Sequence, residues 1–119
     1  TEDTTEVNGA LGESVTFELK TSPPFKQIFW LKSERNKDPS NIALLKTEEG
    51  CTTDVLLPAF QGRLNASEDC RRLQVRDLRP GDSGRYTTQI YRGGTSEPLR
   101  EAFDLRVYIP GAETTLLLI

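Results

Sequence analysis

The sequence contains no histidine among its 119 residues. Histidine is the commonest general base and transition-metal ligand in proteins, so its absence removes most acid–base catalysis and any histidine-based pH switch. Two cysteines alone cannot build a four-ligand zinc site. The sequence also has no G-x-S-x-G stretch, no phosphate-binding Walker loop and no histidine-bearing catalytic triad. We therefore expect a protein that is not an enzyme and that uses no small-molecule substrate, metal or cofactor.

Long apolar runs and clustered basic charge are missing as well. No stretch approaches the roughly 20 apolar residues that a membrane-spanning helix needs. The net charge is −3, and acidic and basic residues are interspersed along the chain. Because nucleic-acid binding calls for a clustered basic footprint, we expect no nucleic-acid partner. With 35% apolar and 28% charged residues, the composition is that of one soluble globular domain.

Short runs of alternating residues, broken by turn residues, predict strands along the whole chain. In the first run Val15, Phe17 and Leu19 alternate with polar residues, and Pro23 and Pro24 follow. The predicted strands cover residues 14–20, 27–32, 42–46, 52–57, 72–76, 85–91 and 103–108. There is no long helical periodicity. About nine short strands in one domain predict an all-β sandwich of the larger, variable type.

The segment from Leu73 to Tyr86 is the most informative part of the sequence. Its pattern, L-x-V-x-x-L followed by D-S-G-x-Y, resembles the corner between strands E and F of immunoglobulin domains. The resemblance implies that the Tyr86 hydroxyl bonds back across the turn and that Asp82 pairs with an arginine, here Arg63. Trp30 follows Leu19 at the spacing of the core tryptophan. A generic hairpin is the alternative interpretation of this segment.

The cysteines that usually join the two sheets are absent, since the same alignment places Leu19 and Thr88 at their positions. The opening stretch from Val7 to Phe17, V-N-G-A-L-G-E-S-V-T-F, resembles the membrane-distal V domain of the SLAM family of lymphocyte receptors. Those domains also lack the inter-sheet disulfide. The segments I-F-W-L at 28–31, I-A-L-L at 42–45 and D-L-R-V-Y at 104–108 resemble their C, C′ and G strands, so the resemblance covers residues 5 to 108.

The resemblance implies an all-β immunoglobulin V-set β-sandwich that lacks the usual inter-sheet disulfide and spans residues 1–109. Residues 110–119 are expected to be a linker or the stub of a following segment. Their apolar end, Leu116 to Ile119, is equally consistent with a strand-like tail that packs on a neighbour. The expected location is the extracellular side of the plasma membrane, as part of a type I membrane protein, or secretion.

The two cysteines, Cys51 and Cys70, fall in loops that lie at the same end of a variable-type sandwich. A disulfide between them would close a loop of about 18 residues and stabilise the fold by about 3 kcal/mol. We predict this disulfide, with free or intermolecular thiols as the alternative. The sequence Asn65-Ala66-Ser67 is the only N-glycosylation motif, and we predict glycosylation of Asn65 near the turn between strands D and E.

One face of the predicted sheet carries apolar side chains that point outward. Because Trp30 is expected to point inward, Phe29 and Leu31 point outward, and Tyr91 does the same on the neighbouring strand. An apolar centre with a charged surround is typical of protein interfaces. Arg35 belongs to that surround. The predicted partner-binding residues are Phe29, Leu31, Lys32, Glu34, Lys46, Gln89, Tyr91, Arg92, Asp104 and Arg106.

In the SLAM family the corresponding sheet binds a like V domain, often of the same protein. The resemblance therefore implies a cell-surface adhesion or immune recognition domain with a protein partner and a weak homodimer. A decoy mimic of such a receptor, soluble or encoded by a pathogen, is the alternative, and the additional cysteine pair favours it. An antigen-receptor variable domain is disfavoured because no F-G-x-G stretch follows Phe103. Scattered or loop-covered surface residues are the alternative explanation for Phe29 and Leu31.

Overall fold

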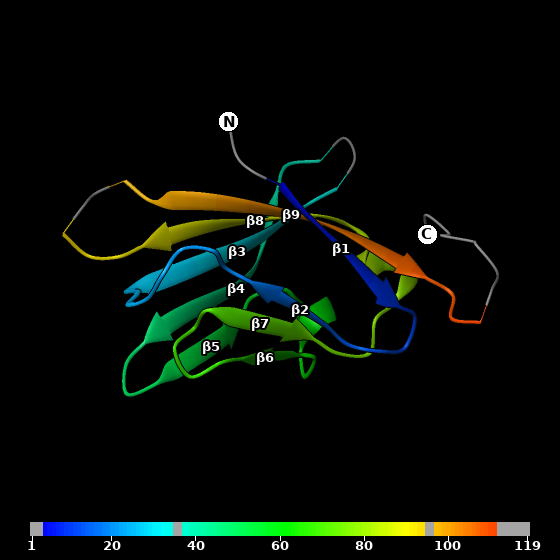
Figure 1. Cartoon of the computed structure of the whole chain (residues 1–119), viewed down its shortest axis with the longest axis horizontal. Coiled ribbons are helices and arrows are strands. Elements are labelled where there is room, and N and C mark those ends of the chain that lie inside the picture. Colours follow the sequence, from blue (N-terminus) through cyan, green and yellow to red (C-terminus); the bar gives the residue numbers. More distant parts are fainter. Residues whose placement is uncertain (1–3, 35–36, 95–96, 112–119) are drawn as a thin grey trace.

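The described part of the chain contains nine strands and two short 3-10 helices, joined by loops. The computed structural model describes residues 4–34, 37–94 and 97–111. The strands are β1 (Thr4–Ala10), β2 (Val15–Glu18), β3 (Gln27–Ser33), β4 (Ser40–Thr47), β5 (Cys51–Val55), β6 (Leu64–Ala66), β7 (Arg72–Val75), β8 (Gly84–Tyr91) and β9 (Leu99–Tyr108). The helices are η1 (Pro58–Phe60) and η2 (Pro80–Asp82). Figure 1 shows the arrangement.

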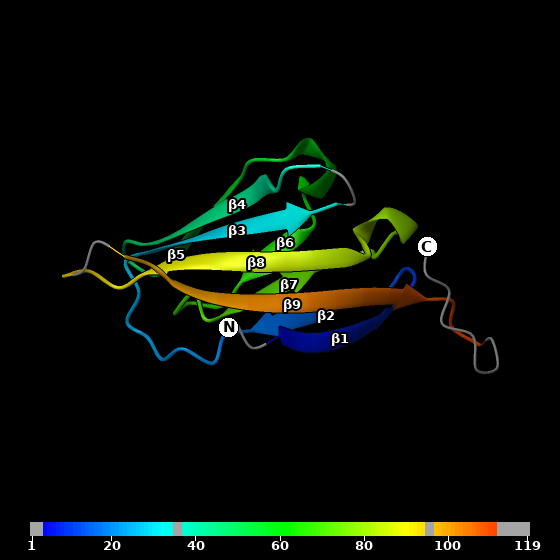
Figure 2. The ribbon, with the colours of Figure 1, turned by 90° about the horizontal axis from the view of Figure 1, so that it is seen from above.

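The strands form two sheets that pack against each other. The six-stranded sheet has the order β1-β9-β8-β3-β4-β5, and the three-stranded sheet has the order β2-β7-β6. Strand β1 runs parallel to β9, whereas the remaining pairs are antiparallel. Figure 2 shows β4, β3, β8, β9 and β1 in this order across the larger sheet. The all-β prediction is therefore confirmed.

Aromatic side chains fill the space between the sheets. The ring of Phe17 on β2 lies 5.5 Å from Trp30, 5.0 Å from Tyr86 and 5.1 Å from Phe103, measured between centroids. All four side chains are essentially inaccessible to solvent. Strand β2 supplies Phe17 because its residues alternate between buried and exposed positions, as the period of two predicts. Leu19 and Thr88, at the positions of the usual disulfide, are both buried in this core.

All seven predicted strands exist, but two strands were missed and some ends differ. Strand β1 escaped prediction because its residues are mostly polar, with only Gly9 fully buried. Strand β6 has three residues, too few for a detectable alternation. Strand β9 begins at Leu99, four residues before the predicted start at Phe103. Arg35 and residues 112–119 of the predicted linker at 110–119 lie outside the described residues.

The predicted corner between β7 and β8 is present. Arg63 binds Asp82 through two hydrogen bonds of 2.8 and 2.9 Å, and both side chains are buried. This bidentate contact raises the pKa of Arg63. The Tyr86 hydroxyl donates to the backbone oxygen of Asp82, and burial raises the pKa of Tyr86. Gly84 adopts a φ of +145°, which a residue with a side chain rarely takes up.

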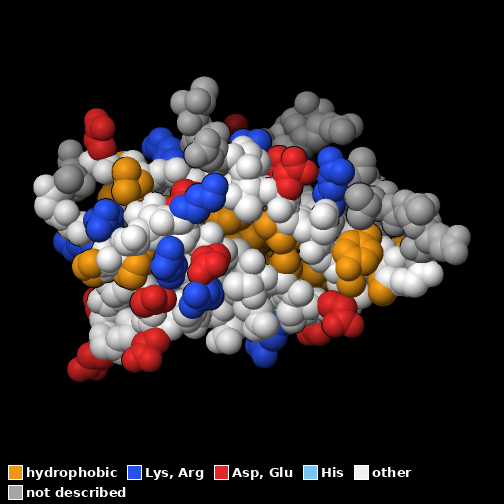
Figure 3. Space-filling model, in the orientation of Figure 1, with side chains coloured by type: hydrophobic (Ala, Val, Ile, Leu, Met, Phe, Trp, Pro, Cys, Tyr) orange, Lys and Arg blue, Asp and Glu red, His pale blue; other side chains and the backbone are white. Residues whose placement is uncertain are grey.

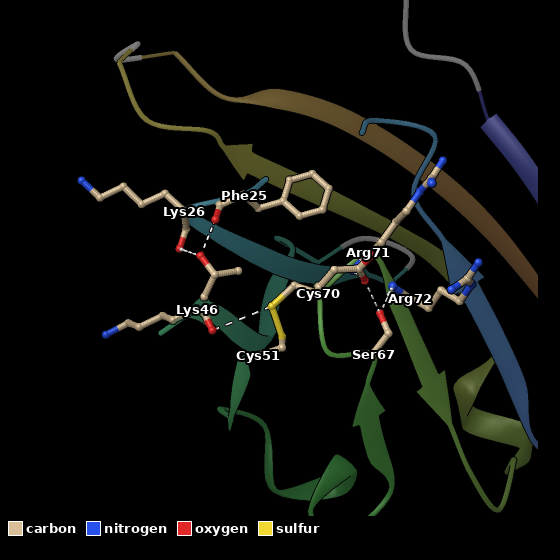
Figure 4. Close-up of a disulfide and its surroundings, with 10 residues drawn as sticks. Phe25, Lys26, Lys46, Cys51, Ser67, Cys70, Arg71 and Arg72 are labelled. Atoms are coloured by element: carbon tan, nitrogen blue, oxygen red, sulfur yellow. Dashed lines mark hydrogen bonds between the residues drawn. A yellow bond between two sulfur atoms is a disulfide. The ribbon is translucent and has the colours of Figure 1, made fainter. Parts of the chain in front are cut away.

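The predicted disulfide between Cys51 and Cys70 is also present (Figure 4), and the Cα atoms lie 5.3 Å apart. Cys51 begins β5 in the six-stranded sheet, and Cys70 lies just before β7 in the three-stranded sheet. The bond therefore joins the two sheets, near one end of the sandwich instead of through its centre. Cys70 Sγ lies 3.8 Å from the backbone oxygen of Lys46, so the disulfide packs beneath the end of β4.

Candidate protein-binding face

Along strand β3 the side chains alternate between the core and the outer surface of the sheet. Ile28, Trp30 and Lys32 are buried, whereas Phe29 and Leu31 are partly exposed. Because successive side chains of a strand point to opposite faces, Phe29 and Leu31 project from the outer surface of the six-stranded sheet. The expected outward orientation of these two apolar residues is confirmed.

Four apolar or aromatic side chains lie on this outer surface. Phe29 lies opposite Leu44 on β4 and Gln89 on β8. The Phe29 and Tyr91 rings make an edge-to-face contact, with centroids 6.2 Å apart and an interplanar angle of 80°. Edge-to-face pairs contribute about 0.5–1.5 kcal/mol beyond their burial, which fixes both rings. We call Phe29, Leu31, Leu44 and Tyr91 the apolar centre.

Polar and charged residues surround the apolar centre at outward positions of the neighbouring strands. Lys46 and Tyr91 flank Gln27 on either side, and Arg100 lies opposite Gln89. Further along the sheet the Arg85 Nε lies 3.2 Å from the Asp104 Oδ1 in a half-exposed ion pair. The outward register thus contains Gln89, Tyr91, Asp104 and Arg106, as the alternation predicts, together with Lys46 from the predicted charged surround.

Lys32 was wrongly predicted on this face. Its exposure is 5%, and it lies in the inward register with Trp30. Its ammonium group donates a 3.1 Å hydrogen bond to Glu34 Oε1 and lies 5.9 Å from the centre of the Tyr86 ring. The apolar stem of a lysine can line a core while its charged end reaches a partner at the sheet end. The hydrogen bond from Lys32 lowers the pKa of Glu34, which is exposed just beyond β3.

Arg92 is exposed, but it does not lie on the outer surface with Gln89 and Tyr91. It follows Tyr91, the last residue of β8, and lines a hollow with Ile90 and Leu99. Ile90 lies in the inward register, so Arg92 borders the inner side of the β8–β9 hairpin. Glu34 lies at the opposite end of the face and also pairs with Lys37 at 3.9 Å.

Leu44 and Arg100 were missed by sequence reasoning. Strand β4 contains a bulge, because Trp30 pairs with Ala43 while Leu31 pairs with Asn41 and Ile42 has no partner on β3. Ile42 and Ala43 are consequently both buried, and the alternation resumes with Leu44 pointing outward. The sequence of four apolar residues, I-A-L-L, gives no sign of this shift. Arg100 was missed because β9 begins earlier than predicted.

Charged side chains of both signs are spread over the surface. On the side of the molecule shown in Figure 3, acidic and basic groups lie interspersed, with hydrophobic side chains visible between them. Within the described residues no cluster of three or more candidate ligands could hold a metal ion. The described part of the chain also contains no helix that is long and apolar enough to cross a membrane.

Comparisons of sequence give no family for this chain. No family model matches it, and no curated protein matches it. Comparisons of structure give many matches. CD84, described as a SLAM family protein, is 25% identical with a TM-score of 0.78, over 90% of this chain and 99% of that one. The first Ig-like domain of human CD48 is 16% identical with a TM-score of 0.75, over 99% and 93%.

A third structural neighbour is the extracellular domain of the voltage-gated sodium channel β4 subunit. It is 16% identical with a TM-score of 0.67, over 90% of this chain and 92% of that one, and it forms parallel homodimers linked to cell–cell adhesion. The chain therefore has the fold of immunoglobulin-like domains. Its neighbours are V-type adhesion and receptor domains, which are not enzymes.

Proposed function

We propose that this chain is a V-set recognition domain of the SLAM type, which binds another V-type immunoglobulin domain through the outer surface of its six-stranded sheet. The observation that carries this proposal is the Phe29–Tyr91 pair, which lies outward together with Leu31 and Leu44. A free sheet surface is normally polar. An apolar centre within a polar and charged surround matches the composition of protein interfaces.

The roles described for two structural neighbours support this proposal. CD84 is a SLAM family protein, and the sodium channel β4 domain forms homodimers in cell adhesion. The partner of this chain is accordingly a second copy or a related V-type domain. The disulfide supports a location outside the cytosol, where disulfides form and persist. The residues proposed to contact the partner are Phe29, Leu31, Glu34, Leu44, Lys46, Gln89, Tyr91, Arg100, Asp104 and Arg106.

Surface plasmon resonance with the purified domain tests the proposal. The domain is passed over immobilised copies of itself and over CD84 and CD48 ectodomains, and binding to at least one of these surfaces is expected. Phe29→Ala and Tyr91→Asp should each abolish that binding, because loss of a side chain that acts as a binding hot spot at the centre of an interface costs about 2 kcal/mol or more. Circular dichroism should show that both variants remain folded, since neither side chain belongs to the core.

A matched control uses the other sheet. Thr16 and Gln74 face each other on the outer surface of the three-stranded sheet, and Thr16→Ala and Gln74→Ala should leave binding unchanged. The proposed face is wrong if Phe29→Ala and Tyr91→Asp bind as tightly as the original domain. It is also wrong if the two control variants lose binding instead.

A further inference from the structure

The outer surface of the three-stranded sheet differs sharply from the apolar centre on the opposite side. Its outward positions are Thr16 and Glu18 on β2, Arg72 and Gln74 on β7, and Asn65 on β6. None of these side chains is apolar, and Glu18 and Arg72 form an ion pair of 2.8 Å. Such a surface needs no covering partner, because its polar groups are already satisfied by each other or by water.

Asn65 lies in the middle of β6, just before the turn that leads to β7, close to where the sequence predicts it. Its neighbours Leu64 and Ala66 are partly buried and pack against the core. Asn65 itself is exposed, because the alternation of the strand turns its side chain away from the core. Its amide therefore projects from the outer surface of the three-stranded sheet, in register with Gln74.

We propose that Asn65 carries an N-linked glycan and that the outer surface of the three-stranded sheet is a carbohydrate-bearing face with no protein partner. In the transfer reaction the amide nitrogen of Asn65 bonds to the anomeric carbon of an oligosaccharide. The donor is a lipid-linked oligosaccharyl pyrophosphate. The bond between the anomeric carbon and the pyrophosphate breaks, the pyrophosphate leaves with the bonding electrons, and the amide loses one proton.

The hydrogen bonds of Ser67, the third residue of the motif, favour transfer before this part of the chain folds. The Ser67 hydroxyl donates to Asp69 Oδ1 at 2.8 Å and accepts from the Arg72 backbone nitrogen at 2.9 Å. The disulfide of Cys70 links the same turn to Cys51 on β5. Because the folded turn occupies the Ser67 hydroxyl, the motif is open to the transferase only before the turn folds. The glycan is therefore added during synthesis in the secretory pathway, and the test must use secreted protein.

The first measurement is the mass of the domain secreted from mammalian cells, before and after treatment with peptide N-glycosidase F. The original protein should lose mass on treatment, whereas Asn65→Gln should show no change. Ser67→Thr keeps both the motif and a hydroxyl, so it should behave like the original protein and serves as the matched control. An unshifted mass for the original secreted protein would overturn the proposed modification.

The second measurement compares glycans on the two sheets, and it rests on the binding face proposed above. Thr52→Asn combined with Asp54→Thr creates a new motif on β5, where both residues are exposed at the rim of the apolar centre's sheet. The glycan at Asn65 should change the measured dissociation constant less than about twofold, judged by Asn65→Gln. The added glycan on β5 should weaken binding about tenfold or more, and enzymatic removal should restore it.

The two measurements separate the failure of this inference from that of the proposed function. If Asn65→Gln changes affinity about tenfold or more, the three-stranded sheet takes part in binding and the inference is wrong. If neither glycan affects binding while the masses shift as expected, the modification stands and the proposed binding face is wrong.

Discussion

Glu101 on β9 binds Thr21, which follows the end of β2, and thereby ties the two sheets together. The carboxylate accepts hydrogen bonds of 2.9 Å from the Thr21 backbone nitrogen and 2.7 Å from its hydroxyl. Its other oxygen accepts from the Lys20 backbone nitrogen at 2.9 Å. Thr88, one of the residues at the usual disulfide positions, pairs with Glu101 in the ladder. A polar contact thus lies beside the place where a covalent bond is missing.

Replacing Glu101 by glutamine should destabilise the domain by about 1–3 kcal/mol. An amide has one acceptor oxygen, and its NH₂ group would face donors that the carboxylate now satisfies, so backbone N–H groups lose their partners. Urea unfolding followed by tryptophan fluorescence measures the change, since Trp30 is the only tryptophan and lies in the core. Glu6→Gln, an exposed glutamate on β1, is the matched control and should have no effect. An unchanged midpoint for Glu101→Gln would contradict this role.

The disulfide provides the second tie between the sheets. Removing it with Cys51→Ala and Cys70→Ala should lower the free energy of unfolding by about 3 kcal/mol, because the unfolded chain regains the freedom of the closed loop. A reducing agent should lower the stability of the original domain by a similar amount. The same agent should leave the double variant unaffected, which separates loss of the bond from other effects. Equal stability of the oxidised and reduced forms would refute the prediction.

Particular residues show how far the sequence alone determines fold and site. Trp30 defined the inward register of β3 and so correctly predicted Phe29 and Leu31 as outward residues. Lys32 shares the inward register of Trp30, but its charge favours a prediction at the surface. The sequence gives no sign of its hydrogen bond to Glu34, which satisfies the ammonium group at the end of the sheet. Leu44 depended on a bulge, which arises from pairing between strands and not from the local pattern.

The cysteine pair illustrates a different kind of prediction. The approximate strand positions were enough to place Cys51 and Cys70 at the same end of the sandwich, and the disulfide follows. Glu101 escaped attention because its partners are mainly backbone groups about 80 residues earlier in the chain. Contacts between side chains and distant backbone have no periodic signature, so they become visible only in three dimensions.

Acid should weaken the turn between β6 and β7 through Asp69. Its carboxylate accepts hydrogen bonds from the Arg71 backbone nitrogen at 3.0 Å and from the Ser67 hydroxyl at 2.8 Å. The hydrogen bond from Arg71, followed by that from Ser67, lowers the pKa of Asp69 in the folded state. The folded protein therefore binds this proton less readily than the unfolded chain. The stabilisation is complete above the ordinary aspartate pKa of about 4 and is lost as the pH falls through the lowered value.

Carboxyl-carbon NMR titration measures the Asp69 pKa, and urea unfolding between about pH 2 and 6 measures the linked stability. Asp69→Asn keeps an acceptor oxygen and should reduce the decline of stability in acid. Asp38→Asn alters an exposed aspartate that makes no hydrogen bond to another described residue, so it serves as the control. A pKa for Asp69 at or above its ordinary value would contradict the expected sign.

The contrast between Lys32 and Leu44 tests the corrected face directly. Lys32→Met keeps the apolar stem inside the sandwich and removes the charge, so partner binding should be unchanged and stability should change by about 1 kcal/mol or less. Leu44→Asp places a charge in the apolar centre and should abolish binding, while the fold persists because Leu44 is outside the core cluster. Surface plasmon resonance and thermal unfolding of both variants provide the measurements. Loss of binding in a fully folded Lys32→Met variant would return Lys32 to the interface, whereas normal binding by Leu44→Asp would remove β4 from it.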